Sequence, residues 1–139
     1  MNDDRRPWSD LEIRWEMEKL HERIDDEIAT LKQLGIAKAH ATNERQVQEG
    51  RQVLVAKVKH RNDLTSDKLR EAWVRSNTPV GDLMLQEDLA ATIYWDQKEL
   101  VVTLRQDMSM LQSMLRNAED QVASMGGGRQ RQEPSHQRR

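Results

Sequence analysis

A chain of 139 residues with 36% hydrophobic and 33% charged side chains can form one small core under a large charged surface, and no sizeable globular core. The absence of Cys excludes disulfides, thiolate metal sites and cysteine nucleophiles from this chain. No apolar run approaches the ~18 residues needed to span a bilayer, and the first residues lack the apolar stretch of a signal peptide. We therefore expect a cytoplasmic protein without a membrane partner.

The net charge of −2 hides a strong segregation of charge along the chain. Residues 1–34 carry 6 basic and 10 acidic side chains, and residues 35–77 carry 9 and 5. Residues 78–125 carry 3 and 8, and residues 126–139 carry 4 and 1. The basic middle can pair with the acidic segments on either side of it or present a positive surface to a polyanion, and the sequence leaves both alternatives open.

The first predicted helix covers residues 9–34. Ser9 is placed to cap it, and Glu12 is placed to complete a capping box. Gly35 predicts a break or hinge, because glycine costs roughly 1 kcal/mol relative to alanine inside a helix. A second helix is predicted over about 36–61.

A turn follows this second helix, and a short helix is predicted over 67–76 with Ser66 as its N-cap. The last helix is predicted over 79–125. Thr78 is placed to cap it, and Pro79 suits its first position, where the missing N–H does no harm.

The long helix carries apolar residues at alternating spacings of three and four over six heptads, which predicts a coiled-coil seam. Glu87 at an a position and Gln97 at a d position interrupt it, and such polar residues often set register or oligomeric state. The seam predicts a homo-oligomer, although packing on the first helix of the same chain is the open alternative. The residues expected to carry oligomerisation are Tyr94, Val101, Leu104, Met108, Leu111 and Leu115.

These patterns predict an all-α fold, an elongated helical hairpin or bundle with a long C-terminal coiled-coil helix. Residues 1–125 are expected to form a single helical domain. Three consecutive glycines at 126–128 are expected to end the last helix, and residues 126–139 are expected to form a disordered basic tail.

No pattern in the sequence points to catalysis, a metal or another cofactor. The chain has no phosphate-binding loop, no serine elbow and no HExxH motif. Glu18 and His21 have the spacing of one Glu-x-x-His motif, but a di-iron bundle needs two such motifs and further Glu residues. We therefore expect a non-enzymatic protein without a small-molecule substrate.

The basic middle is the candidate nucleic-acid-binding segment. Its charges form no single helical stripe, so they serve either a nucleic acid or the neighbouring acidic helices. Trp73 lies among basic residues as a candidate stacking platform, although core packing is the favoured role for it. The candidate contacts are Lys38, Arg45, Arg51, Lys57, Lys59 and Arg61.

This arrangement resembles the UvsY-type recombination mediators of tailed phages. The likeness lies in an acidic first helix, the basic Val-Ala-Lys-Val-Lys-His-Arg segment at 55–61, Thr65-Ser66 before a short helix, and a long final helix with the pair Tyr94-Trp95. The resemblance implies a homo-oligomer that binds single-stranded DNA and helps a recombinase to displace single-strand binding protein, in the host cytoplasm if the protein is phage-encoded. It implies DNA contacts at Lys57, Lys59 and Arg61.

The leading hypothesis is thus a phage-type recombination mediator. The alternative is a helical phage structural or assembly protein, such as a scaffold, chaperone or coiled-coil adaptor, that binds no nucleic acid. A third class is a small regulator whose basic tail binds nucleic acid by itself.

Overall fold

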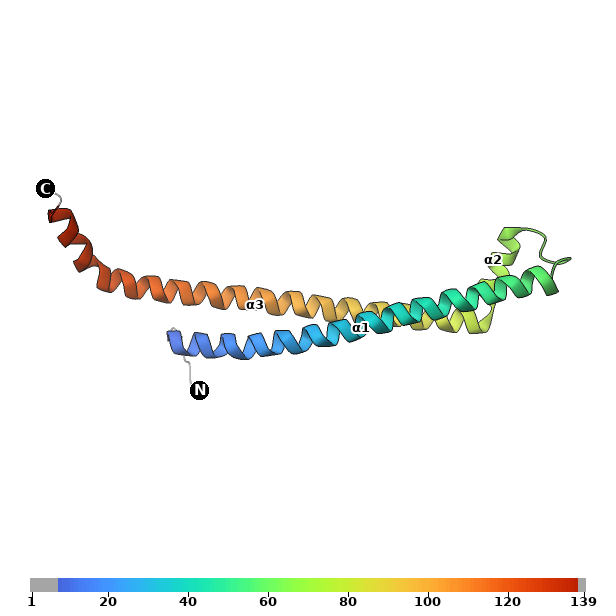
Figure 1. The fold of residues 1–139 in the computed structure, drawn as a ribbon, viewed down its shortest axis with the longest axis horizontal. Helices are drawn as coiled ribbons and strands as arrows, with labels where there is room; N and C mark the ends of the chain where they lie inside the picture. Colours follow the sequence, from blue (N-terminus) through green and yellow to red (C-terminus); the bar gives the residue numbers. More distant parts are fainter. Residues whose placement is uncertain (1–7, 138–139) are drawn as a thin grey trace, which may run out of the picture. The chain divides into compact units, whose positions relative to one another are not determined.

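The computed structural model describes the backbone of residues 8–137 and the side chains of residues 8–125. Three helices make up this part of the chain: α1 (Asp10–Lys59), α2 (Asp67–Ser76) and α3 (Thr78–Gln137) (Figure 1). No strand occurs among the described residues. The predicted all-α class is confirmed.

Helix α1 begins where the capping box predicts. The Glu12 amide donates to Ser9 Oγ at 3.3 Å, and the Ser9 amide donates to Glu12 Oε2 at 3.2 Å. The helix then passes through Gly35 without interruption, so the prediction of separate helices over 9–34 and 36–61 is wrong. Gly35 lies against the Tyr94 ring, since a Cβ at Gly35 would be 3.4 Å from Tyr94 Cε2. Gly35 therefore faces α3 of the same chain and does not interrupt α1.

Helix α2 has the predicted bounds and the predicted cap, because Ser66 Oγ accepts the Leu69 amide at 3.2 Å. Helix α3 starts at Thr78, one residue earlier than predicted, with the Gly81 amide donating to the Asn77 carbonyl at 2.9 Å.

Helix α3 continues through the three glycines to Gln137, so the prediction of a helix end at residue 125 is wrong. The disorder expected for residues 126–139 stays a prediction. Glycine weakens a helix by roughly 1 kcal/mol per residue but ends one chiefly by adopting a positive φ, and no described glycine does so. The last two residues of the predicted tail, 138–139, lie outside the described residues.

The chain forms two compact units. Unit 1 consists of Met1–Asp26 with Val101–Arg139, and unit 2 consists of Glu27–Leu100. Within each unit a segment of α1 lies beside a segment of α3 that runs in the opposite direction (Figure 1). Each unit is therefore built on a helical hairpin, and the packing of the long helix on the first helix of the same chain is confirmed.

The core of unit 1 is aliphatic. Ile13 and Ile24 of α1 and Val101 and Leu104 of α3 are all less than a tenth exposed. Val101 and Leu104 are neighbouring a and d residues of the predicted seam, so α1 covers the seam here. Beyond α1 the seam is uncovered, because Val122 and Met125 are 66% and 85% exposed.

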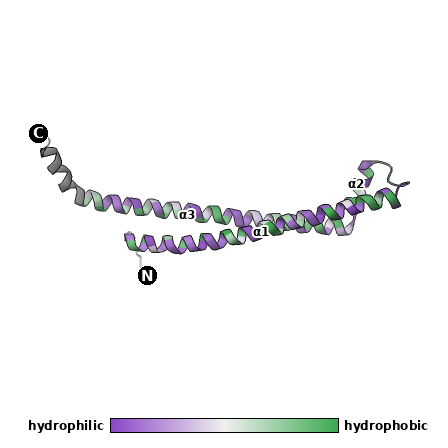
Figure 2. Ribbon diagram, viewed as in Figure 1, coloured by the Kyte–Doolittle hydropathy of each residue, from purple (hydrophilic) through white to green (hydrophobic). Residues whose placement is uncertain are grey.

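The core of unit 2 is smaller and is also aliphatic. Ala56, Val74 and Val80 are buried, one from each helix. Much of the remaining seam is half-buried, including Tyr94. Hydrophobic and hydrophilic residues alternate along both long helices (Figure 2). Two helices alone cannot enclose a wide apolar face, so much of it remains accessible.

Candidate nucleic-acid interface

Lys57, Lys59 and Arg61 lie together where α1 ends and the connection to α2 begins, in unit 2. All three side chains are exposed. Because two of them occupy the last turn of α1, their charges also complement the negative end of the helix dipole. The three residues that the resemblance implies as DNA contacts are therefore all exposed at this end of unit 2, with Lys57 and Lys59 on different sides of α1 because they are two residues apart on a helix.

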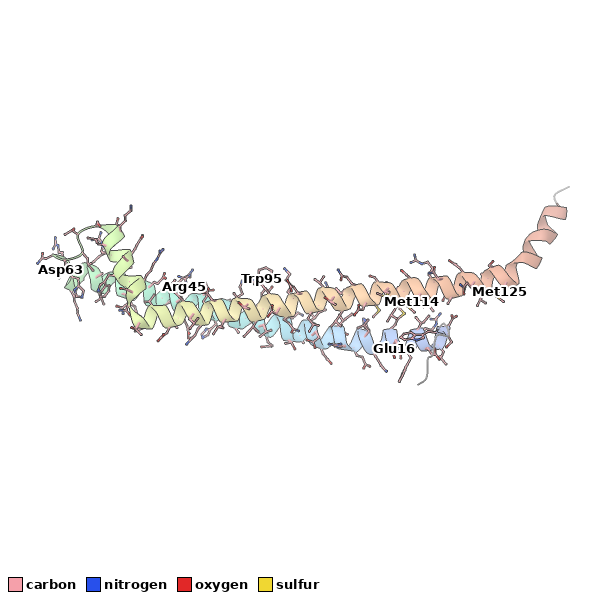
Figure 3. The ribbon with its side chains drawn as sticks, turned by 180° about the vertical axis from the view of Figure 1, so that it is seen from behind. Glu16, Arg45, Asp63, Trp95, Met114 and Met125 are labelled. Atoms are coloured by element: carbon pink, nitrogen blue, oxygen red, sulfur yellow. The ribbon has the colours of Figure 1, made fainter. Side chains whose placement is uncertain are left out.

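Helix α2 is fixed beside this helix end by one ring contact and one buried side chain. The His60 and Trp73 rings lie 5.0 Å apart between centroids at an interplanar angle of 45°. Val74 is 4% exposed, whereas His60 and Trp73 are half-buried. Arg70 Nη1 donates to the Leu64 carbonyl at 3.1 Å and ties the connection to α2. Figure 3 shows this region, with Asp63 marking the connection.

We call residues 51–75 the basic end, since they carry seven Lys or Arg and three Asp or Glu. One of the three acids is already neutralised locally, because Asp67 is hydrogen-bonded and ion-paired to Arg70. The hydrogen bond from Arg70, and then its charge, hold the pKa of the Asp67 carboxyl below its usual value. The basic end therefore keeps a net positive charge on an exposed surface.

Two of the other three candidate contacts, Lys38 and Arg45, lie outside the basic end and are half-buried. Arg45 pairs with Glu87 of α3 and, at 2.8 Å, with Glu49 of α1; these hydrogen bonds raise its pKa. Its side chain is 20% exposed. Lys38 is half-buried, with Nζ 5.2 Å from the centroid of the Tyr94 ring.

Arg51, by contrast, is exposed, and it borders a surface depression of about 380 Å³ that Val47 and Leu83 also line. Of the six candidates, four are therefore accessible to a polyanion. Arg45 instead pairs with an acidic residue of α3, which is the other role that the sequence allows for the basic middle.

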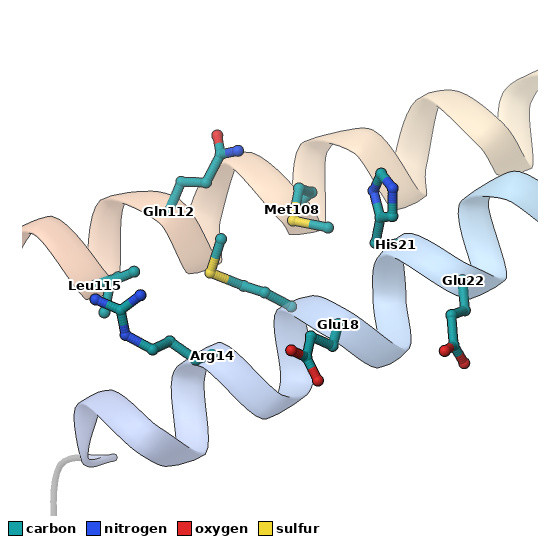
Figure 4. A pocket seen from close by; sticks show the side chains of 8 residues that line it. Arg14, Glu18, His21, Glu22, Met108, Gln112 and Leu115 are labelled. Carbon is teal, nitrogen blue, oxygen red and sulfur yellow. The ribbon is translucent and has the colours of Figure 1, made fainter.

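The residues predicted to carry oligomerisation lie on the face of α3 that meets α1. Val101 and Leu104 are buried there, and the other members are half-buried. Met108 and Leu115 line a groove of about 560 Å³ together with Arg14 and His21 of α1 (Figure 4). Leu111 lines a second groove, of about 380 Å³, within unit 1. Association between chains through this face remains a prediction.

The sequence does not reveal the hydrogen-bond partners of the two polar residues on the seam. Glu87 accepts from Arg45, and Gln97 Nε2 donates to the Glu27 carbonyl at 3.0 Å and to the Glu27 carboxylate. The signal that could have found them is their position: a polar residue on an apolar seam requires a partner on the facing helix.

Among the described residues, no three His, Asp or Glu side chains are grouped to hold a metal ion. Glu18 and His21, the single Glu-x-x-His pair, line the 560 Å³ groove together with Glu22, and these three side chains are not grouped to hold a metal ion. None of the helices in the described part of the chain is long and apolar enough to cross a membrane.

No family model, curated protein or solved structure matches this chain. The most distinctive group of residues in the chain is the basic end, where exposed cations lie beside a half-buried ring pair.

Proposed function

We propose that the protein is a non-enzymatic accessory protein that binds single-stranded DNA through the basic end of unit 2. The observation that carries the proposal is the cluster of exposed cations, Lys57, Lys59 and Arg61, next to the His60–Trp73 ring pair. Lys and Arg side chains neutralise phosphates and release counterions, which supplies affinity for any nucleic-acid backbone.

The ring pair favours a single strand over a duplex. Unpaired bases expose faces that stack on aromatic side chains, whereas the bases of a duplex are stacked on each other. Trp73 is half-buried, so part of its ring packs on His60 and part of its surface is accessible. A base that stacks on the accessible part of the ring would have its phosphates within reach of the exposed cations of the basic end.

The role in recombination rests on the resemblance to UvsY-type mediators. We propose that the protein helps to load a recombinase on DNA covered by single-strand binding protein. The basic segment at 55–61 that carries the resemblance lies in the basic end.

The test is fluorescence anisotropy with a labelled oligothymidine over a salt series. Three phosphate contacts predict that log K falls with log salt at a slope of about −2, from about −0.7 per contact on a single strand. Lys57→Glu with Lys59→Glu should abolish most of the binding and flatten the slope, because it removes two contacts and adds repulsion.

The matched control is Lys19→Glu with Arg23→Glu, which reverses two exposed charges on the same helix but in unit 1. This control should bind like the wild type. No binding by the wild-type protein at low salt, or equal losses in the two double variants, would reject the proposed interface.

A second candidate function is a helical structural or assembly protein without nucleic-acid binding. The observation that favours it is the number of large apolar side chains that unit 2 leaves exposed on both long helices, among them Leu54, Val58 and Leu85. In that case the wild-type protein would fail to bind oligothymidine and would still associate with itself or with another helical protein.

A further inference from the structure

Helix α1 has a second apolar face in unit 2, which we call the α1 outer stripe. Ile36, Val47, Leu54 and Val58 are 64%, 46%, 63% and 77% exposed. At about 100° per residue these four positions fall within about 40° of one another around the helix. Arg45, which contacts Glu87 of α3, lies about 180° from Ile36. The α1 outer stripe therefore points away from α3, except at the edge where Val47 borders the depression that Leu83 of α3 also lines.

Helix α3 has a corresponding face, which we call the α3 outer stripe. Leu85, Leu89 and Ile93 are 60%, 55% and 51% exposed and follow each other at spacings of four. Tyr94, which packs on Gly35 of α1, lies about 180° from Leu85. The two stripes thus face in opposite directions on the hairpin of unit 2.

The charges that border the two stripes have opposite signs. The α1 outer stripe is bordered by exposed basic side chains, and its one acidic neighbour, Glu44, is bridged to His40 at 3.0 Å. The α3 outer stripe is bordered by acidic side chains, and the one basic residue of α3 in unit 2, Lys98, lies over the Trp95 ring on the other side of the helix. The bordering residues are Lys32, Arg51 and Lys57 on α1, and Asp82, Asp88, Asp96 and Glu99 on α3.

The acids bordering the α3 outer stripe have no ion-pair partner among the described side chains. Within residues 8–125, whose side chains the structure describes, Asp82, Asp88, Asp96 and Glu99 form no ion pair. An acidic face with an apolar centre and a basic face with an apolar centre complement each other in both charge and hydropathy.

We propose that the occupant of each outer stripe is a second copy of this chain, with the α1 outer stripe of one copy packed on the α3 outer stripe of the next. Pairing of two α3 outer stripes would bring four acids of one copy against four of the other, and pairing of two α1 outer stripes would oppose basic borders. Only the mixed pairing places opposite charges around the apolar contact.

Such an interface is heterologous, because each copy uses two different surfaces that face in opposite directions. Each added copy leaves one stripe of each kind open, so assembly proceeds beyond a dimer until it closes into a ring or continues as a filament. This interface differs from the predicted α3 seam, which faces α1 of its own chain. It goes beyond the proposed DNA binding and does not depend on it, while Arg51 and Lys57 belong both to the border of the α1 outer stripe and to the candidate DNA contacts.

The test uses one variant in each stripe and then their mixture, with sedimentation velocity as the measurement. Leu54→Glu places an acid opposite the acidic border of the α3 outer stripe, and Leu89→Lys places a base opposite the basic border of the α1 outer stripe. The wild-type protein should form species larger than a dimer, and each variant alone should sediment as a monomer. An equimolar mixture should form a 1:1 complex of twice the monomer mass, because each variant retains the stripe that the other has lost.

Leu11→Glu is the matched control, since Leu11 is 78% exposed on the same helix but in unit 1. It should assemble like the wild type, and circular dichroism should show equal helix content in all variants. A monomeric wild type would overturn the proposal, as would either stripe variant that assembles normally. Two monomeric, fully helical variants that form no complex on mixing would also overturn it, because the intact α1 outer stripe of one and the intact α3 outer stripe of the other would then fail to bind each other.

Discussion

The two units use the same pair of helices in different ways. In unit 1 the residues buried between α1 and α3 are aliphatic, with Ile13, Ile24, Val101 and Leu104 as the core. In unit 2 the interface between the helices includes an ion-pair network and an amide side chain. The comparison shows that one antiparallel hairpin can be specified by apolar burial in one segment and by polar contacts in another.

The polar contacts of unit 2 constrain the register of its helices. Arg45 and Glu87 are 20% and 23% exposed, so their pair is shielded more than a surface ion pair. Gln97 adds a hydrogen bond at 3.0 Å to the Glu27 carbonyl. A slip of one helix along the other would leave these groups partly buried without partners, which costs about 1–3 kcal/mol for each group.

Unit 1 has a weaker polar contribution. Its ion pair between Arg14 and Glu119, at 2.9 Å, joins side chains that are 59% and 50% exposed. An exposed pair of this kind stabilises by at most about 1 kcal/mol. The alignment of the helices in unit 1 therefore depends on the burial of its aliphatic residues.

The largest expected effect follows from this dependence. Leu104→Asp should destabilise unit 1 by about 3 kcal/mol or more, because it replaces a side chain that is 3% exposed with a carboxylate that has no partner. Hydrogen exchange should show lost protection in α1 before residue 27 and in α3 after residue 100. Amides of unit 2 should keep most of their protection.

Met110→Asp is the control for this prediction, because Met110 is 61% exposed on the same helix. Its effect should stay within about 0.5 kcal/mol. Equal loss of protection in both units after Leu104→Asp would show that the units do not differ as the comparison states.

The sequence predicts local features of this fold better than long-range ones. The caps at Ser9 and Ser66 are readable because each requires only a hydroxyl and the amide three residues later. The apolar seam of α3 is readable from its spacing. What covers the seam is not, because an apolar face fits the same chain or another chain equally well. The break predicted at Gly35 is wrong for the same reason, since its neighbour Tyr94 is far away in the sequence.

The candidate site shows the same limit. Lys57, Lys59 and Arg61 could be grouped from the sequence because they are neighbours in the chain. Arg45 carries the same charge, yet it pairs with Glu87, which is 42 residues away. A basic side chain in a helix is equally suited to a phosphate and to a carboxylate, and only the fold brings the carboxylate to it.

The next prediction concerns the polar contacts of unit 2. Glu87→Ala should destabilise unit 2 by about 1–2 kcal/mol, because Arg45 loses one of two hydrogen-bonded carboxylates while remaining partly buried. A double-mutant cycle with Arg45→Ala, measured by urea unfolding, should give a coupling energy of about 1 kcal/mol.

The control cycle pairs Arg14→Ala with Glu119→Ala in unit 1, where both side chains are exposed. Its coupling energy should be below about 0.5 kcal/mol. If the two cycles give the same value, the polar contacts do not distinguish the units.

The smallest expected effect compares two glycines of α1 that both belong to unit 2. Gly50→Ala should stabilise the protein by about 0.5–1 kcal/mol, because a Cβ there meets nothing within 4 Å and the helix loses the entropic penalty of glycine. Gly35→Ala should gain less, since its Cβ comes to 3.4 Å from Tyr94 Cε2 and the ring has to adjust. Urea unfolding of the two variants measures the difference. A larger gain at position 35 than at position 50 would mean that the Tyr94 ring does not constrain the interface between the helices at Gly35.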